Sequence, residues 1–213
     1  MTKLLINLFV KDRENVTDPT VRRRYAMLAS ITGIVLNLLL FAGKLSVGIL
    51  AVSVAVIADA FNNVSDAGSS VITLIGFRLS GKHEDKRHPW GHGRLEYVSA
   101  FIVDMLIILV GAELLKSSVD KIIHPELPAV SAATIVLLVV AILVKLWLFL
   151  FYRKIGALIN SSAIKAASFD SISDTVATTL VLVSALIGKF AGVGIDGWAG
   201  IFVAGFILFT GVK

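Results

Sequence analysis

Residues 58–66 read ADAFNNVSD, and residues 166–174 read AASFDSISD. Aligned position by position, the two stretches share an alanine, a phenylalanine, a serine and the final aspartate, and each lies inside a long apolar segment. Each carries two oxygen-bearing side chains four residues apart: Asn62 with Asp66, and Asp170 with Asp174. Residues four apart lie on one face of a helix. The pattern therefore predicts two helices that present oxygen ligands toward a common divalent cation.

The composition is that of an integral, multi-pass membrane protein in contact with a lipid bilayer. The 213 residues are 56% hydrophobic and 16% charged, against about 25% charged in an average soluble domain. Cysteine is absent, which excludes thiolate metal sites and disulfides and disfavours Cu(I). The net charge of +5 fits Lys and Arg beside cytoplasmic helix ends, so it predicts no nucleic-acid partner.

The apolar runs predict an all-α membrane protein with six transmembrane helices, since about 20 such residues cross a bilayer. A cytoplasmic N-terminal segment, 1–25, begins with a short stretch expected to lie on the membrane surface. The transport domain, 26–213, is expected to contain spans at 27–50, 51–79, 97–115, 130–151, 162–187 and 198–212. The sequence stops right after the sixth span, so no C-terminal cytoplasmic domain is expected within it; the alternatives are a truncated sequence and a protein that lacks such a domain.

The distribution of Lys and Arg places both termini in the cytoplasm. One side of the predicted bundle has most of these residues: Arg22, Arg23, Arg24, Arg78, Lys82, Lys86, Arg87, Arg94, Arg153, Lys154 and Lys165. The other side has Lys116, Lys121 and Lys189. The second and fifth spans then run antiparallel, which gives helices 2 and 5 the inverted similarity that transporters use around a midplane site. Asp66 and Asp174 should lie roughly 18 Å deep in an apolar core about 30 Å thick.

The predicted ligands limit the choice of metal. They are one amide and three carboxylates: Asn62, Asp66, Asp170 and Asp174. An all-oxygen set suits hard, six-coordinate cations such as Mn²⁺, Mg²⁺ or Fe²⁺, whereas Zn²⁺ generally takes His or Cys. We predict Mn²⁺ as the bound ion. The alternative is that the aspartates form structural salt bridges with Lys44 or Lys145.

Five more polar residues lie inside the predicted spans: Asn37, Asp59, Asn63, Asp104 and Glu113. The sequence leaves packing, charge pairing and pathway lining open for each of them. A second candidate metal site lies in the polar loop before residue 94, where Asp85, His88 and His92 stand at i, i+3 and i+7. The competing interpretation is a solvated loop, and two imidazoles would suit Zn²⁺ better than Mn²⁺. No enzyme motif is present, because the loop histidines lack the spacing of a zinc protease helix.

The two motifs, together with HPWGHGRLE at residues 88–96, resemble the cation diffusion facilitator family from about Arg22 onward. The resemblance implies a homodimeric, six-helix exporter that moves a divalent metal out of the cytoplasm in exchange for protons. It also matches Asp85, His88 and His92 to the family's loop site. In zinc-transporting members the intramembrane quartet includes a histidine. The all-oxygen quartet here is similar to the manganese-exporting branch.

We therefore expect a Mn²⁺/H⁺ antiporter without a bound cofactor, in the plasma membrane of a bacterium or archaeon. An exporter of Zn²⁺, Fe²⁺ or Mg²⁺ by the same mechanism is the nearest alternative. An alternative of another class is a divalent cation channel, or a membrane scaffold whose charges only stabilise the helix bundle.

Overall fold

The structure is a computed structural model that describes the backbone of all residues except 1, 11, 13, 80–92, 125–128, 193 and 213. Side chains are described for the same residues, apart from 3, 76–79, 93–104, 106, 107 and 210–212. The described chain is entirely helical between its turns: α1 Thr2–Phe9, α2 Pro19–Ala51, α3 Val54–Leu79, α4 Gly93–Ile123, α5 Ala132–Leu158, α6 Ser162–Ala191 and α7 Asp196–Val212. The all-α prediction is confirmed for this part of the chain, which contains no strand.

Local hydrogen bonds explain where several helices begin and end. Asp18 caps α2 by accepting a hydrogen bond from the Thr20 backbone N–H at 2.6 Å, and this backbone bond lowers the pKa of the Asp18 carboxyl. Val52 then ends α2 in the left-handed conformation, with φ at 52°, so α3 starts at Val54 rather than at residue 51 as predicted. Ser131 caps α5 through the Thr134 N–H, so α5 begins two residues later than the predicted span.

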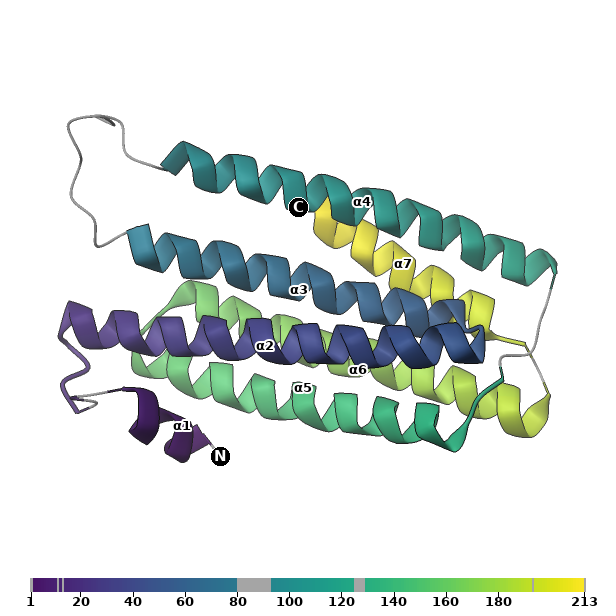
Figure 1. Cartoon of the computed structure of the whole chain (residues 1–213), viewed down its shortest axis with the longest axis horizontal. Helices are drawn as coiled ribbons and strands as arrows, with labels where there is room; N and C mark the ends of the chain where they lie inside the picture. The colour runs from purple at the N-terminus through teal and green to yellow at the C-terminus, as the bar shows by residue number, and fades with distance from the viewer. Residues whose placement is uncertain are drawn as a thin grey trace.

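The helices form an elongated bundle in which α3 lies against α2, α4, α6 and α7 (Figure 1). Helix α5 packs on α2 and on α6, and α4 packs on α7. Helices α3 and α6, which carry the two similar stretches, run in opposite directions through the bundle (Figure 1). Among the described residues, three helices are long and apolar enough to cross a membrane: α2, α5 and α6.

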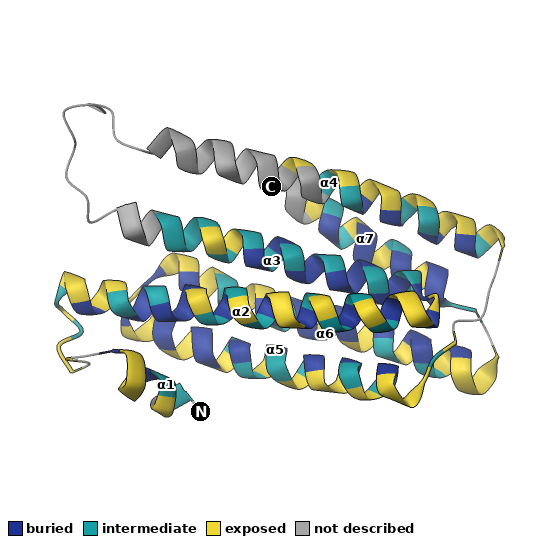
Figure 2. Ribbon diagram, in the orientation of Figure 1, coloured by how far each residue is buried: buried dark blue, intermediate teal, exposed yellow. Residues whose placement is uncertain are grey.

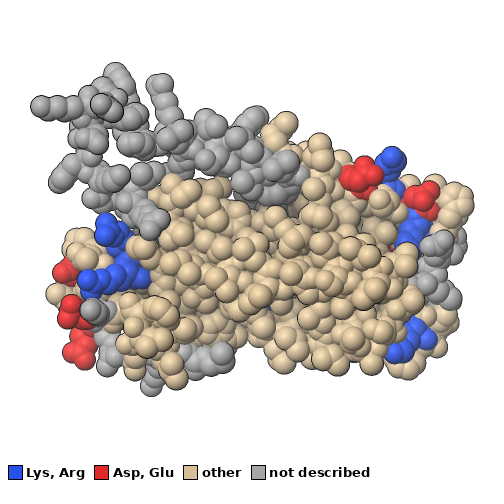
Figure 3. All heavy atoms as spheres, in the orientation of Figure 1, with Lys and Arg blue, Asp and Glu red and all other residues tan. Residues whose placement is uncertain are grey.

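The outer surface is apolar along the middle of the bundle. On the face shown in Figure 3, the described charged side chains gather at the two ends and leave an uncharged band between them. Figure 2 shows exposed residues recurring along the outward sides of α2 and α5. Many of them are large and apolar, such as Leu39 at 64% exposure and Leu143 at 60%. Such a surface fits a lipid environment rather than water.

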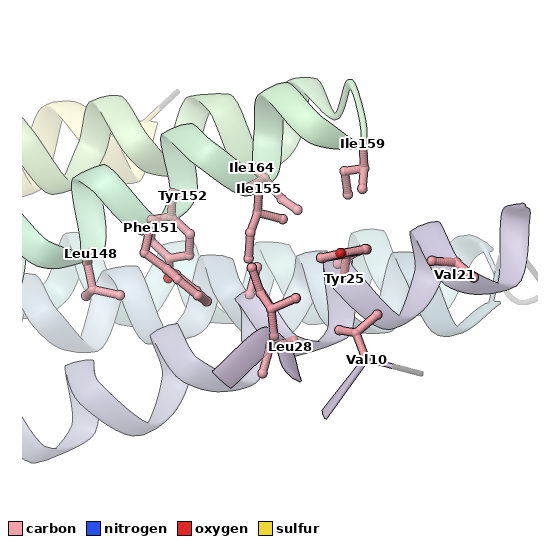
Figure 4. Close-up of a cluster of buried hydrophobic side chains, with 13 residues drawn as sticks. Val10, Val21, Tyr25, Leu28, Leu148, Phe151, Tyr152, Ile155, Ile159 and Ile164 are labelled. Atoms are coloured by element: carbon pink, nitrogen blue, oxygen red, sulfur yellow. The ribbon is translucent and has the colours of Figure 1, made fainter. Parts of the chain in front are cut away.

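One apolar cluster holds the N-terminal segment against the bundle (Figure 4). Tyr25 and Leu28 from α2 pack with Phe151 and Ile155 from α5, and Val10, directly after α1, joins them. Helix α1 buries its inner side here and leaves Leu4, Leu8 and Phe9 exposed. The N-terminal segment therefore does form a short helix at the start of the chain.

Candidate metal centre

The two similar stretches meet inside the bundle. The Asn62 amide on α3 donates a hydrogen bond to Asp174 Oδ1 on α6, with Nδ2 and Oδ1 2.5 Å apart. Both side chains belong to buried residues. Asn62 and Asp174 therefore lie at the same depth of the bundle.

Lys145 joins the same group from α5. Its Nζ atom lies 2.6 Å from Asp66 Oδ2 and 2.6 Å from Asp174 Oδ2. Because both carboxylate oxygens lie 2.6 Å from the same Nζ atom, they are at most twice that distance, 5.2 Å, from each other. The lysine side chain is 1% exposed, whereas that of Asp66 is 19% exposed and that of Asp174 is 4% exposed. The salt bridge to Lys145, which the sequence offered as the alternative to a metal ligand set, is present in the structure.

Asp170, the fourth predicted ligand, is more exposed than the other three. It lies one helical turn before Asp174 on α6 and lines the same cavity as Asp66, Asp174 and Lys145. The structure therefore connects Asn62, Asp66 and Asp174 through direct contacts and places Asp170 on the wall beside them. Within the described residues, no three His, Asp or Glu side chains are grouped closely enough to hold a metal ion by themselves.

The cavity has a volume of about 230 Å³ and runs from the two carboxylates toward one end of the bundle. Its wall combines polar and small residues of four helices: Ala29, Ser30, Asn37, Asp66, Ser69, Ser70, Thr73, Lys145, Tyr152, Ala163, Ile164, Ala166, Ala167, Asp170, Ser171 and Asp174. Apart from the carboxylates, most of these wall residues lie toward the starts of α2 and α6 and the ends of α3 and α5. These four helix ends lie at the same end of the bundle in Figure 1. Exposed Ser69 and Ala163 belong to this wall, so the cavity is accessible from that end.

A second buried polar network lies on the opposite side of the carboxylates. Lys44 Nζ on α2 is 2.7 Å from Asp59 Oδ2 on α3, and their side chains are 0% and 1% exposed. Thr178 on α6 accepts a hydrogen bond from Lys44 and donates one to Asp59 Oδ1, both at 3.0 Å. Asp59 precedes Asn62 by three residues and Thr178 follows Asp174 by four. This Lys44–Asp59–Thr178 network therefore ties α2, α3 and α6 together about one helical turn beyond the candidate site.

The structure assigns different surroundings to the other polar residues inside the predicted spans. Asn63 donates a hydrogen bond to the Asp59 carbonyl oxygen at 2.9 Å, within α3. Asn37 is buried and lines the cavity, and its Oδ1 atom has no hydrogen-bond partner in the described structure. Glu113 is exposed, and the side chain of Asp104 lies outside the described residues.

Two features of the site were not predicted as such. Lys145 was named only as a competing salt-bridge partner, although a single lysine within the apolar run IVLLVVAILVKLWLF, residues 135–149, is itself a signal of a buried acidic partner. Tyr152 lies two helical turns after Lys145 on α5 and also lines the cavity. No pattern of polar residues in the sequence pointed to it. The predicted loop site of Asp85, His88 and His92 lies outside the described residues.

The fold and the site define a helical membrane protein with buried carboxylates at the floor of a polar cavity. The sequence profile of the cation efflux transmembrane domain matches residues 30–213. This chain therefore belongs to the cation efflux family, also called the cation diffusion facilitators, whose members are transporters and not enzymes.

Curated relatives agree with this assignment. An uncharacterized transporter of Methanocaldococcus jannaschii is 32% identical over 82% of this chain and 62% of its own length. The manganese efflux system protein MneP of Bacillus subtilis is 31% identical over 78% of this chain and 54% of its own length. MneS, a second manganese efflux system protein of that organism, is 31% identical over 77% of this chain and 54% of its own length. The chain thus spans between about half and three fifths of the length of these relatives.

Proposed function

We propose that this chain exports a hard divalent cation through the cavity that ends at Asp66 and Asp174, and that this cation is Mn²⁺. One observation carries the proposal: carboxylates from two helices with the same motif converge at the closed end of a polar cavity. Buried carboxylates in a membrane bundle are costly and are retained mainly where they serve ions or protons. A cation that passes to the closed end of the cavity reaches these oxygens.

The same geometry supports a direction of access. We infer six membrane spans, 27–50, 51–79, 97–115, 130–151, 162–187 and 198–212, with both termini in the cytoplasm. The accessible end of the cavity is then the cytoplasmic end, where Arg22 and Arg153 also lie. Toward the other end, the Lys44–Asp59–Thr178 network fills the space between α2, α3 and α6. This arrangement corresponds to an inward-facing transporter, and export requires the helices to rock until the site faces outward.

The proposed cation follows from the ligand types. Asn62, Asp66, Asp170 and Asp174 offer only oxygen ligands if the amide turns its oxygen to the metal, and waters in the cavity complete a six-coordinate shell. The names of MneP and MneS, which concern manganese efflux, support the same choice. Zn²⁺, Fe²⁺ and Mg²⁺ are the alternative cargoes. Protons are proposed as the counter-ion, since the emptied carboxylates can bind them in place of the metal.

The proposed assembly is a homodimer in the plasma membrane of a bacterium or archaeon. The family resemblance supports this assembly, and the apolar outer band of the bundle supports the bilayer as the surrounding medium (Figure 3). The competing function is a membrane scaffold, and the ion pairs of Lys145 with Asp66 and Asp174 favour it, because they satisfy the carboxylates without a metal. A channel is a further alternative, which would pass metal without moving protons.

Calorimetric titration of the purified full chain tests the proposal. MnCl₂, ZnCl₂, FeCl₂ and MgCl₂ are titrated into the parent protein, into Asp174→Asn and into the matched control Asp120→Asn, whose carboxylate is 75% exposed at the end of α4. We expect Mn²⁺ to bind the parent and the control equally, and to bind Asp174→Asn at least tenfold more weakly. No saturable binding of any of the four metals to the parent would contradict the transporter function.

A further inference from the structure

Lys145 occupies the position between Asp66 and Asp174 where a bound cation would lie. We propose that Lys145 is an internal counter-cation, which offsets part of the negative charge of the site when the cargo is absent and which the metal displaces on binding. The inference rests on the proposed function. It adds to that function a residue that sets the metal affinity and that permits the empty site to return from the outward-facing to the inward-facing position. It assigns a transport role to the α5 lysine, which lies outside the two motifs.

The contact geometry makes the lysine and the metal compete. A divalent cation binds carboxylate oxygens at about 2.0–2.2 Å, and the Oδ2 atoms of Asp66 and Asp174 both contact Nζ at 2.6 Å. An ammonium and a divalent ion cannot share a space bounded by two oxygens at most 5.2 Å apart. Metal binding to both carboxylates therefore requires Nζ to move away.

The formal charges give the lysine a role in the empty site. Asp66 and Asp174 with Lys145 carry a formal charge of −1, from two carboxylates and one ammonium, and Asp170 adds a carboxylate at an exposed position of the cavity wall. Without the lysine, the two inner carboxylates of the empty site would carry −2. Because an uncompensated charge within the apolar core costs several kcal/mol, Lys145 lowers the cost of the empty state.

The cavity offers a place for the displaced ammonium. Lys145 lines it together with Asn37, whose buried Oδ1 atom has no hydrogen-bond partner in the described part of the chain. A buried amide oxygen without a partner is unfavourable, and an ammonium is a suitable donor for it. The four-carbon stem of lysine allows Nζ to reposition without backbone movement. Asn37 therefore serves as the acceptor for Lys145 when the metal occupies the carboxylates.

Two consequences distinguish this role from a structural salt bridge. Removing the ammonium removes a competitor, so Lys145→Met should bind Mn²⁺ more tightly than the parent, by tenfold or more. The same variant should lose net transport, since its empty site keeps one more negative charge than the empty site of the parent during the return step. Exchange of Mn²⁺ for Mn²⁺ across the membrane should continue, because a site that stays loaded does not need the lysine for its return.

The test measures Mn²⁺ affinity by calorimetry, and net uptake and Mn²⁺/Mn²⁺ exchange in sealed vesicles, for the parent, Lys145→Met and Lys145→Arg. Lys189→Met, at an exposed position of α6, controls for the loss of one positive charge. Lys145→Arg covers the case in which the methionine variant does not fold. Its guanidinium holds two carboxylates more firmly, so it should weaken Mn²⁺ binding and slow net transport at least tenfold.

The outcomes separate this inference from the proposed function. Tighter binding with exchange retained and net uptake lost in Lys145→Met supports the counter-cation role, as does weaker binding in Lys145→Arg. A parent that binds and transports Mn²⁺, with equal or weaker affinity in Lys145→Met or unchanged affinity in Lys145→Arg, overturns the role of Lys145 alone. A parent that neither binds nor transports a divalent metal overturns the proposed function itself.

Discussion

Lys145 Nζ and Asp174 Oδ2 lie 2.6 Å apart and join α5 to α6 in the interior of the bundle. The same Nζ reaches Asp66 on α3, so a single ammonium connects the helices that carry the two similar motifs. A purely structural salt bridge needs no accessible space, yet here the three side chains line a cavity that is accessible from one end. A site that exchanges one cation for another requires both an ion pair and a route of access, and this site has both.

The first prediction concerns selectivity at Asn62. We expect Asn62→His to raise the ratio of zinc to manganese transport, because imidazole is a preferred zinc ligand and the amide it replaces lies 2.5 Å from Asp174 Oδ1. A change of about tenfold is of the size that one ligand substitution can give. Uptake of both metals into vesicles at several pH values measures it. An unchanged ratio would place Asn62 outside the coordination shell.

The second prediction concerns the network beyond the site. We expect Lys44→Met to reduce the free energy of unfolding by about 3–5 kcal/mol, because it leaves the Asp59 carboxylate buried without its countercharge. Lys44→Met combined with Asp59→Asn should recover most of the loss, since no charge then remains unpaired. Thermal unfolding of the purified protein in detergent compares the two. Equal stability of the single and double variants would show that the ion pair has no such role.

The third prediction concerns the packing of α7 on α4. A Cβ atom on Gly197 would lie 2.9 Å from the Ser118 carbonyl oxygen, a backbone atom that cannot turn away. Gly197→Ala should therefore destabilise the protein by about 1–3 kcal/mol through overpacking. Gly205→Ala on the same helix is the matched control, because a Cβ there meets nothing within 4 Å. Equal melting temperatures for the two variants would contradict the close approach of α4 and α7.

The fourth prediction uses the cap of α2. Because the native pKa of Asp18 is lowered, its contribution to stability is complete above the ordinary aspartate pKa and is lost as the pH falls through the native value. Asp18→Ala should therefore lower the free energy of unfolding at neutral pH. It should have no effect at a pH below both the native and the ordinary pKa of this carboxyl. Unfolding of the two proteins between pH 7 and pH 2 measures the difference. A difference that stays constant with pH would mean that the charge of Asp18 is not involved.

Sequence patterns were sufficient for the all-helical class of the fold and for the proximity of three of the four predicted ligands. Apolar runs identify membrane-type helices because few other structures satisfy the backbone in such segments. The four-residue spacing in both motifs then predicts that Asn62, Asp66 and Asp174 can face one point, and the structure brings these three together. Helix ends were less predictable, since a single left-handed residue such as Val52 displaced the start of α3.

The partners of the charged residues could not be derived from the sequence. Lys44 and Lys145 were both possible partners for the aspartates, and their spacing along the chain does not say which face of α2 or α5 meets α3. Helix packing decides this: Lys145 reaches Asp66 and Asp174, whereas Lys44 reaches Asp59. Packing also decides that Asp170, at an exposed position of α6, lies on the cavity wall.

The most direct test of the account is metal-driven flux through sealed vesicles that contain the full chain, Asp174→Asn or the surface control Asp120→Asn. Inward-directed Mn²⁺ gradients are imposed, and Mn²⁺ entry and proton release are recorded together. We predict coupled Mn²⁺ and proton movement for the parent and the control, and a loss of at least a hundredfold in both for Asp174→Asn, because one of three anionic ligands is removed. Flux that persists unchanged in Asp174→Asn would contradict the assignment of the buried carboxylates as the transport site.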